Sequence, residues 1–380
     1  MIITKSCTLI NHNYILLYGT FFLFSIIFSF LINRLFLKFS STLGTKNNGE
    51  GNIIRWSSTS KPAMGGISFY ILFLASIASY SVFFAPEETA LNYNPKFVGL
   101  LLSMALGFLV GLADDAYNTR PVLKFSVQFL CAIVLIATDI YIHIFDNEIL
   151  NYALTMLWVV GIMNSINMLD NMDGITTIVS ISILVTIIVM IWLEHDFNNI
   201  HLIVLVGVLA SLTGFLYFNW HPSKMYMGDT GSQFLGVFLS SMGILYFWND
   251  FYNPHAPVAV SKQFLLAIIA FIMPIIDTTI VVINRLSRGQ SPFVGGKDHT
   301  THSLAYLGLS DRQVALAFAG ISANSIFLIT YIKRYLIVWS WEFTTIFISY
   351  FFTLLIVFFC FAFKAKGKTT KNSTPKLKTV

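Results

Sequence analysis

The run GITTIVSISILVTIIVMIWL, residues 174–193, decides the fold class of this 380-residue chain. It carries no charged residue and is as long as the roughly 20 residues that an apolar α-helix needs to cross a bilayer. The whole chain is 56% hydrophobic and only 11% charged. In lipid only helices and closed barrels satisfy the backbone, and runs of this length are too long for barrel strands. We therefore predict an all-α, polytopic integral membrane protein.

Charges, glycines, prolines and asparagines divide the chain into ten or eleven such segments. The eleven that we predict to span the membrane are residues 14–37, 66–85, 97–113, 123–144, 149–168, 174–193, 200–218, 232–248, 263–285, 313–332 and 336–363. They form one multi-span domain, residues 1–363. The Lys/Thr-rich residues 364–380 show no apolar periodicity, so we expect a disordered basic tail.

Lys and Arg residues set the predicted orientation. Most of the 23 bases lie in alternate loops and in the tail, whereas the intervening loops carry mainly acids. Since cytoplasmic loops are enriched in bases, we predict an external N-terminus and a cytoplasmic C-terminus. Lys333 and Arg334 break this pattern. The net charge of +5 does not indicate nucleic acid as a partner, because the bases do not follow an aromatic-lined face.

Five polar patches are wedged between the apolar segments, and we expect all five on one side of the membrane. They are residues 60–66, Asp114 with Asp115, residues 164–174, residues 219–229 and residues 285–302. Charged and imidazole side chains at the ends of membrane segments are costly, which makes them functional candidates.

The Asp114–Asp115 pair can be interpreted in two ways. Two adjacent carboxylates can hold a divalent cation, or one can act as a base whose pKa the other tunes. A solvated helix end is the simpler alternative. Arg120 and Lys124, which follow, are typical of basic anchors on the cytoplasmic side.

The second acidic patch has a regular spacing: Asn164, Asn167, Asp170 and Asp173 recur every three residues. On a helix this spacing keeps the four side chains near one face, and oxygen-only ligands suit Mg²⁺. Helix caps would explain one or two of these residues but not all four.

Two further patches indicate phosphate binding. Asp229 opens a predicted helix between Gly228 and Gly231, where free backbone N–H groups favour phosphate oxygens; a capped turn is the alternative. In the last patch His299 and His302 lie one helical turn apart among Arg and Lys residues, which could neutralise a diphosphate. Asp277 lies inside a predicted span, where it is either functional or paired with a neighbouring helix.

These residues, from about 60 to 307, resemble the polyprenyl-phosphate N-acetylhexosamine-1-phosphate transferases in the order and spacing of all five patches. The resemblance implies transfer of a sugar-1-phosphate from a UDP-N-acetylhexosamine to a polyprenyl phosphate in the lipid bilayer, with release of UMP and a requirement for Mg²⁺. It also implies the bacterial cytoplasmic (inner) membrane as the location, with the active site on the cytoplasmic face. A homodimer is left open.

The resemblance assigns roles to individual residues. Asp114 and Asp115 match the catalytic pair that engages the lipid phosphate, and Asn167 and Asp229 match positions that approach Mg²⁺. The expected substrate-binding residues are Lys61, Asn164, Asp170, Asp173, Asn219, Tyr226, Arg288, His299 and His302. Among them, Asn219 and Tyr226 match positions that hold the uracil ring.

The chain departs from the family pattern at two places. Asn171 replaces the first glycine of an Asp-Gly-x-Asp-Gly motif. One member of an adjacent histidine pair is missing, with Thr301 or Ser303 in its place, and Arg288 or Lys297 could supply the lost charge.

The sugar is the least determined part of the prediction. Arg285, Gly289 and the Ser-Pro-Phe stretch at 291–293 favour the branch that uses UDP-GlcNAc and starts envelope polysaccharides. The alternative is the phospho-MurNAc-pentapeptide transferase of peptidoglycan synthesis. Outside this reaction, a membrane transporter would need polar residues at mid-span depth, whereas here they gather at one face. A catalytically idle assembly protein is a third possibility.

Overall fold

The structure is a computed structural model that describes residues 2–39, 61–83, 94–197, 199–249, 259–292, 296–336 and 338–373, with side chains from 14 to 366. Within these residues the regular structure is helical, apart from one isolated parallel β-bridge between Ala63 and Tyr226. The prediction of an all-α, polytopic membrane protein is confirmed.

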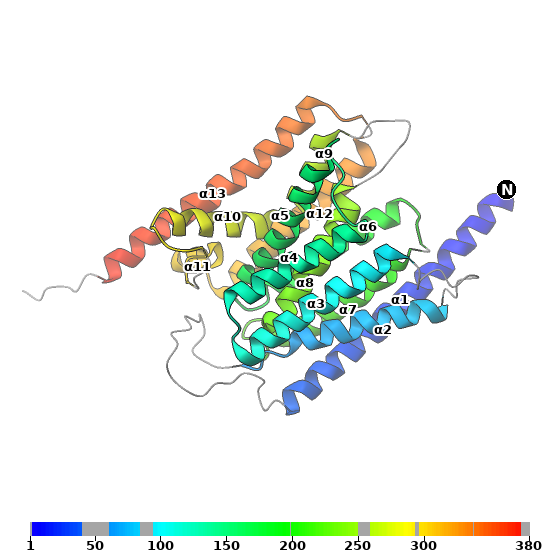
Figure 1. Ribbon diagram of the computed structural model, residues 1–380, viewed down its shortest axis with the longest axis horizontal. Coiled ribbons are helices and arrows are strands. Elements are labelled where there is room, and N and C mark those ends of the chain that lie inside the picture. The colour runs from blue at the N-terminus through cyan, green and yellow to red at the C-terminus, as the bar shows by residue number, and fades with distance from the viewer. Residues whose placement is uncertain are drawn as a thin grey trace, which may run out of the picture.

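Figure 1 shows the helices as an elongated bundle. In chain order they are α1 (Ile2–Phe39), α2 (Gly65–Phe83), α3 (Pro95–Tyr117), α4 (Pro121–Ala137), α5 (Glu148–Leu169), α6 (Ile175–Leu193), α7 (Ile200–Asn219), α8 (Gly228–Gly243), the π-helical segment η2 (Ile244–Trp248), α9 (Val260–Ala270), α10 (Ile272–Leu286), α11 (Thr300–Tyr306), α12 (Asp311–Tyr335) and α13 (Trp341–Ser373).

Among the described residues, eight helices are long and apolar enough to cross a membrane, or nine if α9 and α10 are counted as one span. The other two predicted segments coincide with shorter helices, α4 and α8, and α8 continues into η2. Each of the eleven predicted segments therefore corresponds to a helix or a helix pair. The orientation of the termini remains a prediction.

The predicted single span 263–285 is wrong in one respect. It consists of two helices, α9 and α10, whose axes bend by 80° at Phe271. Pro274 is the third residue of α10, where a missing backbone N–H leaves no helical hydrogen bond unmade. Because hydropathy is continuous across the break, the sequence pattern shows one segment where the backbone makes two.

The C-terminal helix also differs from the prediction. α13 continues beyond Phe363 to Ser373, so the first part of the predicted disordered tail is helical. Residues 374–380 lie outside the described residues.

α8 forms the centre of the bundle and positions the site. It packs against α2, α3 and α5, and every residue from Thr230 to Gly243 is buried. α1 and α13 lie on opposite flanks of the bundle in Figure 1 and expose many Leu, Ile and Phe side chains, as expected of surfaces that face lipid. The N-terminus of α8 is thereby held inside the protein, at one end of the bundle.

Candidate active site

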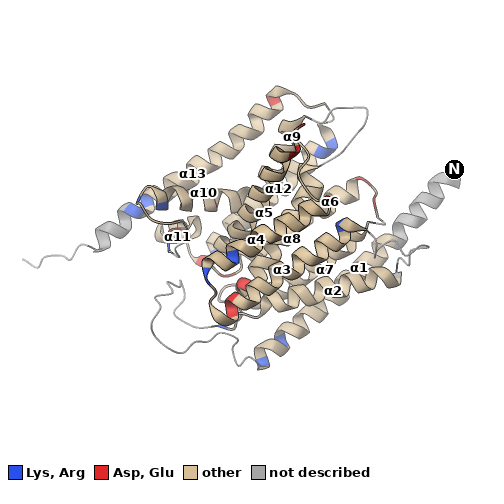
Figure 2. Ribbon diagram, in the orientation of Figure 1, with Lys and Arg blue, Asp and Glu red and all other residues tan. Residues whose placement is uncertain are grey.

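Acidic and basic side chains gather where α3 ends and α4 begins. Figure 2 shows this group in the lower centre of the view, in a molecule whose helices are otherwise mostly uncharged. The C-terminus of α5 and the N-terminus of α8 reach the same place, since Asn167 and Asp229 contact each other there. Polar patches that lie far apart in the sequence are thus brought together.

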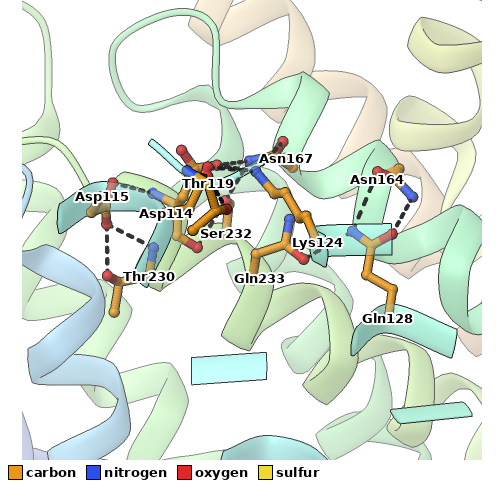
Figure 3. A network of polar contacts seen from close by, with 11 residues as sticks. Asp114, Asp115, Thr119, Lys124, Gln128, Asn164, Asn167, Thr230, Ser232 and Gln233 are labelled. Carbon is orange, nitrogen blue, oxygen red and sulfur yellow. Dashed lines mark hydrogen bonds and ion pairs between the residues drawn. The ribbon is translucent and has the colours of Figure 1, made fainter. Parts of the chain in front are cut away.

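The Lys124 ammonium lies at the middle of this group (Figure 3). Its Nζ atom lies 2.7 Å from Asp229 Oδ1, 3.1 Å from Asp114 Oδ2 and 3.5 Å from Asn167 Oδ1. Asn167 in turn donates from Nδ2 to Asp229 Oδ1 at 2.5 Å and to Ser232 Oγ at 2.8 Å. One positive charge is therefore shared by two carboxylates from different helices.

Asp114 has one oxygen that orders the backbone and one that faces Lys124. Its Oδ1 accepts hydrogen bonds from the backbone N and the hydroxyl of Thr119, at 2.9 and 2.6 Å. Its Oδ2 accepts from Lys124. The α3–α4 turn, with Asn118 in the left-handed conformation, is thus closed around this carboxylate.

Asp115 holds the N-terminus of α8. Its Oδ1 accepts from the backbone N of Asp229 at 2.9 Å, and its Oδ2 accepts from the backbone N and hydroxyl of Thr230 at 2.8 and 2.6 Å. These N–H groups have no partner inside a helix, so a carboxylate stabilises them well. Gly228 makes the approach possible, because its φ of 72° and its contact with Asp115 leave no room for a side chain.

A layer of amides lies one helical turn further along each helix. Gln128 Nε2 donates to Gln233 Oε1 at 3.0 Å, and Asn164 Nδ2 donates to Gln128 Oε1 at 2.8 Å (Figure 3). Gln128 and Gln233 are fully buried, and Gln233 Nε2 has no hydrogen-bond partner among the described residues. This amide layer joins α4, α5 and α8 directly behind Lys124.

Asp170 lies among negative charges that its surroundings do not balance. Burial, followed by the charges of three nearby carboxylates, raises the pKa of Asp170 to about 8. These carboxylates belong to Asp229, Asp115 and Asp173. Within the described part of the chain no hydrogen bond or ion pair to the Asp170 side chain is found. A cation at this place would relieve the repulsion.

The donor set fits a hard divalent cation. Asn167 and Asp229 offer side-chain oxygens beside an excess of carboxylates, and Mg²⁺ prefers oxygen ligands that it shares with substrate phosphates. No three His, Cys, Asp or Glu side chains among the described residues are grouped so as to hold a metal by themselves.

Asp173 orders the loop between α7 and α8. It accepts hydrogen bonds from the backbone N and hydroxyl of Ser223, at 2.9 and 2.7 Å, and lies 3.0 Å from His221 Nδ1. Lys61 donates to Ser223 Oγ at 2.9 Å, and its ammonium lies 5.2 Å from the centre of the Tyr226 ring. Lys61, Asp173 and Tyr226, which the sequence placed in one substrate site, are thus neighbours.

Asn219 is buried and its side chain is used by the protein itself. Its Oδ1 accepts from Gly174 N at 3.1 Å and from Thr177 Oγ1 at 2.8 Å, while its Nδ2 donates to Met225 O. In this structure Asn219 joins the start of α6 to the loop that carries Tyr226. Its predicted contact with a uracil ring is not tested by this arrangement.

The buried carboxylate of Asp277 organises the histidine motif. Its Oδ2 lies 2.9 Å from His299 Nδ1, and its Oδ1 accepts from the backbone N and hydroxyl of Thr300, at 2.8 and 2.6 Å. The contact of Nδ1 with Asp277 fixes the orientation of the His299 ring. Burial and the nearby His299 lower the pKa of His302 to about 4, so this histidine is neutral at pH 7.

Arg288 lies at the edge of the histidine motif and, among the described residues, forms no ion pair with the carboxylates around Lys124. Its Nη2 forms an ion pair with Asp298 Oδ2 at 2.7 Å, and Arg285 holds the same carboxylate through two nitrogens. Burial alone would raise the pKa of Asp298, but the hydrogen bonds and charge of Arg285 lower it. Residues 293–295 of this loop lie outside the described residues.

Sequence reasoning missed the central position of Lys124, which we interpreted as a basic anchor. Lys124 and Gln128 are four residues apart, and so are Asp229 and Gln233. A polar residue one turn into each apolar segment is the signal that could have identified the buried faces of α4 and α8.

Comparisons with known proteins show which proteins this chain is similar to. The model of Glycosyl transferase family 4 matches residues 97–247. A probable undecaprenyl-phosphate N-acetylglucosaminyl 1-phosphate transferase of Bacillus subtilis (strain 168) is 32% identical over 67% of this chain and 68% of its own length. The decaprenyl-phosphate N-acetylglucosaminephosphotransferase of Mycobacterium tuberculosis (strain ATCC 25618 / H37Rv) is 28% identical over 68% and 69%. A phospho-N-acetylmuramoyl-pentapeptide-transferase of Aliarcobacter butzleri is 28% identical over 48% and 60%.

Proposed function

The chain belongs to glycosyl transferase family 4, and from this membership we propose that it transfers N-acetylglucosamine-1-phosphate from UDP-GlcNAc to a polyprenyl phosphate. The products are polyprenyl diphosphate N-acetylglucosamine and UMP, and the reaction would begin an envelope polysaccharide. The names and coverage of the relatives support this acceptor and this sugar over the pentapeptide alternative. The cytoplasmic face of the bacterial inner membrane is part of the proposal.

In this reaction an oxygen of the lipid phosphate attacks the β-phosphorus of the UDP-sugar in line with the departing UMP. The new bond is between that oxygen and the β-phosphorus, and the bond that breaks is the diphosphate P–O bond to UMP. Such a transfer depends mainly on alignment and charge neutralisation. A two-step route through an aspartyl phosphate is the alternative.

The two residues of the aspartate pair serve different purposes in this mechanism. Asp115 makes three hydrogen bonds to the start of α8, so it acts as a positioning residue. Asp114 shares Lys124 with Asp229, so its Oδ2 is the oxygen that a lipid phosphate would meet beside the ammonium. Lys124 would hold the phosphates of donor and acceptor close to each other.

Mg²⁺ would be held by Asn167 and Asp229 together with the diphosphate. When bound, it neutralises the charge that moves to UMP during transfer. Ser232 and Lys124 orient these two ligands through their hydrogen bonds. Asp170, with its raised pKa, marks the place where negative charge is in excess.

The observation that carries the proposal is the meeting of Asp114, Asn167 and Asp229 around Lys124 in a member of this family. The test is release of UMP by purified protein with polyprenyl phosphate and Mg²⁺. We expect release from UDP-GlcNAc, none without Mg²⁺, and much less from UDP-GalNAc or UDP-MurNAc-pentapeptide. Faster release from UDP-MurNAc-pentapeptide would show instead that the protein is a phospho-MurNAc-pentapeptide transferase.

Asp229→Ala should abolish UMP release, because it removes a metal ligand and a partner of Lys124. The matched control is Asp146→Asn, since Asp146 is an exposed acid in the α4–α5 loop. If Asp229→Ala released UMP as fast as the parent, the enzymatic proposal would be wrong. UDP-GlcNAc labelled in the sugar, added without lipid, distinguishes the two routes, because only the covalent route releases UMP and leaves GlcNAc-1-phosphate bonded to an aspartate of the protein.

A further inference from the structure

The two departures from the family pattern contact each other in the structure. Thr301 Oγ1 donates a hydrogen bond of 2.5 Å to Asn171 Oδ1, across 130 residues of sequence. Ser303, the other residue that could replace the missing histidine, donates instead to His299 O within its own helix. Thr301 is therefore the residue that faces the acidic loop between α5 and α6.

The surroundings of both residues fix which one donates and which one accepts. Asn171 Nδ2 donates to Met168 O at 2.9 Å, one of the last carbonyls of α5, and this leaves Oδ1 to face Thr301. A glycine at position 171 could make neither contact. Thr301 is fully buried, so its hydroxyl needs a partner within the protein.

The hydrogen bond lies between two groups of candidate substrate-binding residues. In the sequence Asn171 follows Asp170 and lies two residues before Asp173, whereas Thr301 lies between His299 and His302. Asp277 fixes α11 to α10 through His299 and Thr300. The bond from Thr301 to Asn171 adds an attachment on the side of the acidic loop, so the spacing between the acids and the histidines depends on it.

We propose that Asn171 and Thr301 form a positioning pair that sets the spacing between the acidic loop and the histidines, and thereby the seat of the sugar diphosphate. In the family pattern the loop carries a small residue, glycine, and the helix a large one, histidine. Here the loop carries the larger Asn171 and α11 the smaller Thr301, so the space taken by one side chain is given up by the other. A histidine at 301 would need the space that the Asn171 amide occupies. This inference rests on the proposed function for the identity of the ligand.

The first test compares Thr301→Val, which keeps the shape but removes the donor, with Thr301→Ser, which keeps the donor. Loss of the donor leaves Asn171 Oδ1 without its partner, so we expect Thr301→Val to raise the KM for UDP-GlcNAc by roughly five- to tenfold. Thr301→Ser should stay within about twofold of the parent. Ser303→Ala is the matched control, since it removes a buried hydroxyl from the same helix without touching the loop. Equal KM values for Thr301→Val and Thr301→Ser would overturn the proposal.

The second test is reciprocal. Thr301→His alone should reduce kcat/KM by more than about tenfold, because the imidazole meets Asn171. Adding Asn171→Gly should recover most of this loss, and purely additive losses in the double variant would contradict the pairing.

Binding of UMP and thermal unfolding are measured on the same variants. If the parent releases no UMP from any UDP-sugar, the proposed function fails while the pair is still judged by these two measurements. If Thr301→His and Asn171→Gly have non-additive effects on UMP binding and on the unfolding temperature, the two residues act as a pair. Additive effects on these two quantities would overturn the proposal.

Discussion

Lys124 is a single residue on which two carboxylates depend. Its side chain is 17% exposed, that of Asp114 is 12% exposed and that of Asp229 is 32% exposed, so the first two charges are largely removed from solvent and the third is part-buried. Removing one member of such a group leaves the others uncompensated, which costs more than the net value of the ion pair.

Because the group is only part-buried, Lys124→Met should lower the free energy of unfolding by about 2 kcal/mol, the usual value of a hydrogen bond to a charged group, and it should abolish UMP release. The control is Lys96→Met, because Lys96 pairs with Asp139 at 2.8 Å but both side chains are about half exposed or more. Exposed pairs contribute about 0–1 kcal/mol, so this variant should unfold close to the parent temperature. Equal losses in the two variants, measured by thermal unfolding in detergent, would argue against a central role for Lys124.

Asp170 makes stability depend on pH in a defined direction. Its pKa in the folded protein is about 8, above the ordinary 3.8, so the folded state binds the proton more tightly than the unfolded state. The stabilisation that this gives is complete below pH 4, declines as pH rises, and is lost above about pH 8. Asp170→Asn removes this dependence.

We expect Asp170→Asn to raise the unfolding temperature at pH 8.5 by more than it does at pH 5, in metal-free buffer. Asp146→Asn, at an exposed position, should show no such difference between the two pH values. A constant effect of Asp170→Asn across this range would mean that the carboxyl does not titrate between about pH 5 and pH 8.5 in the folded protein, against the prediction.

At the scale of elements, the start of α8 is the most constrained point of the site. Gly228 has a positive φ and lies against the Asp115 carboxylate, so a methyl group there would strain the backbone and push the carboxylate away. Gly228→Ala should destabilise the protein by roughly 1–3 kcal/mol and impair transfer.

Gly320→Ala is the control for this prediction, since Gly320 lies within α12 and no atom lies within 4 Å of an added methyl group. Alanine is favoured over glycine inside a helix, so this variant should be as stable as the parent or more stable. Thermal unfolding of both variants in the same detergent checks the pair of expectations.

The sequence predicted where along the chain the apolar helices lie, but not where a helix bends or how far it extends past its apolar part. Apolar length located each segment, since membrane helices are specified by composition. The 80° bend at Phe271 depends on local backbone geometry that hydropathy does not carry. Likewise, the extension of α13 to Ser373 could not be seen from a tail with few apolar residues.

The sequence indicated which residues lie in the candidate site better than it indicated which of them contact each other. Asp114, Asn167 and Asp229, which we expected in one site, lie together around Lys124; acids and amides at membrane-segment ends are rare and costly, which is what drew attention to them. The contact between Thr301 and Asn171 could not be predicted, since it joins two positions whose only common feature was departure from a pattern.

At the scale of the whole molecule, the charge exception at Lys333 has a structural explanation. Lys333, near the end of α12, forms an ion pair of 3.2 Å with Glu194 at the end of α6. A base in this loop is thus accommodated by an acid from a neighbouring helix end, while the remaining bases still favour an external N-terminus.

The orientation is tested by labelling single cysteines introduced at Arg120 and at Asp146, after replacement of the native cysteines. Both positions are exposed; Arg120 directly precedes α4, and Asp146 lies in the loop between α4 and α5. A membrane-impermeant maleimide should label Asp146→Cys on intact cells and Arg120→Cys only after permeabilisation. The reverse result would place the active site outside the cell.

The contact between Asp277 and His299 connects the His299 imidazole to α10, the second helix of the bent apolar segment. A change in the tilt of α10 would therefore move the imidazole directly, without any event at the polar end of the bundle. Since tilt follows bilayer thickness, we expect acyl-chain length to regulate the rate of transfer, so that the surrounding membrane acts as an effector as well as a solvent.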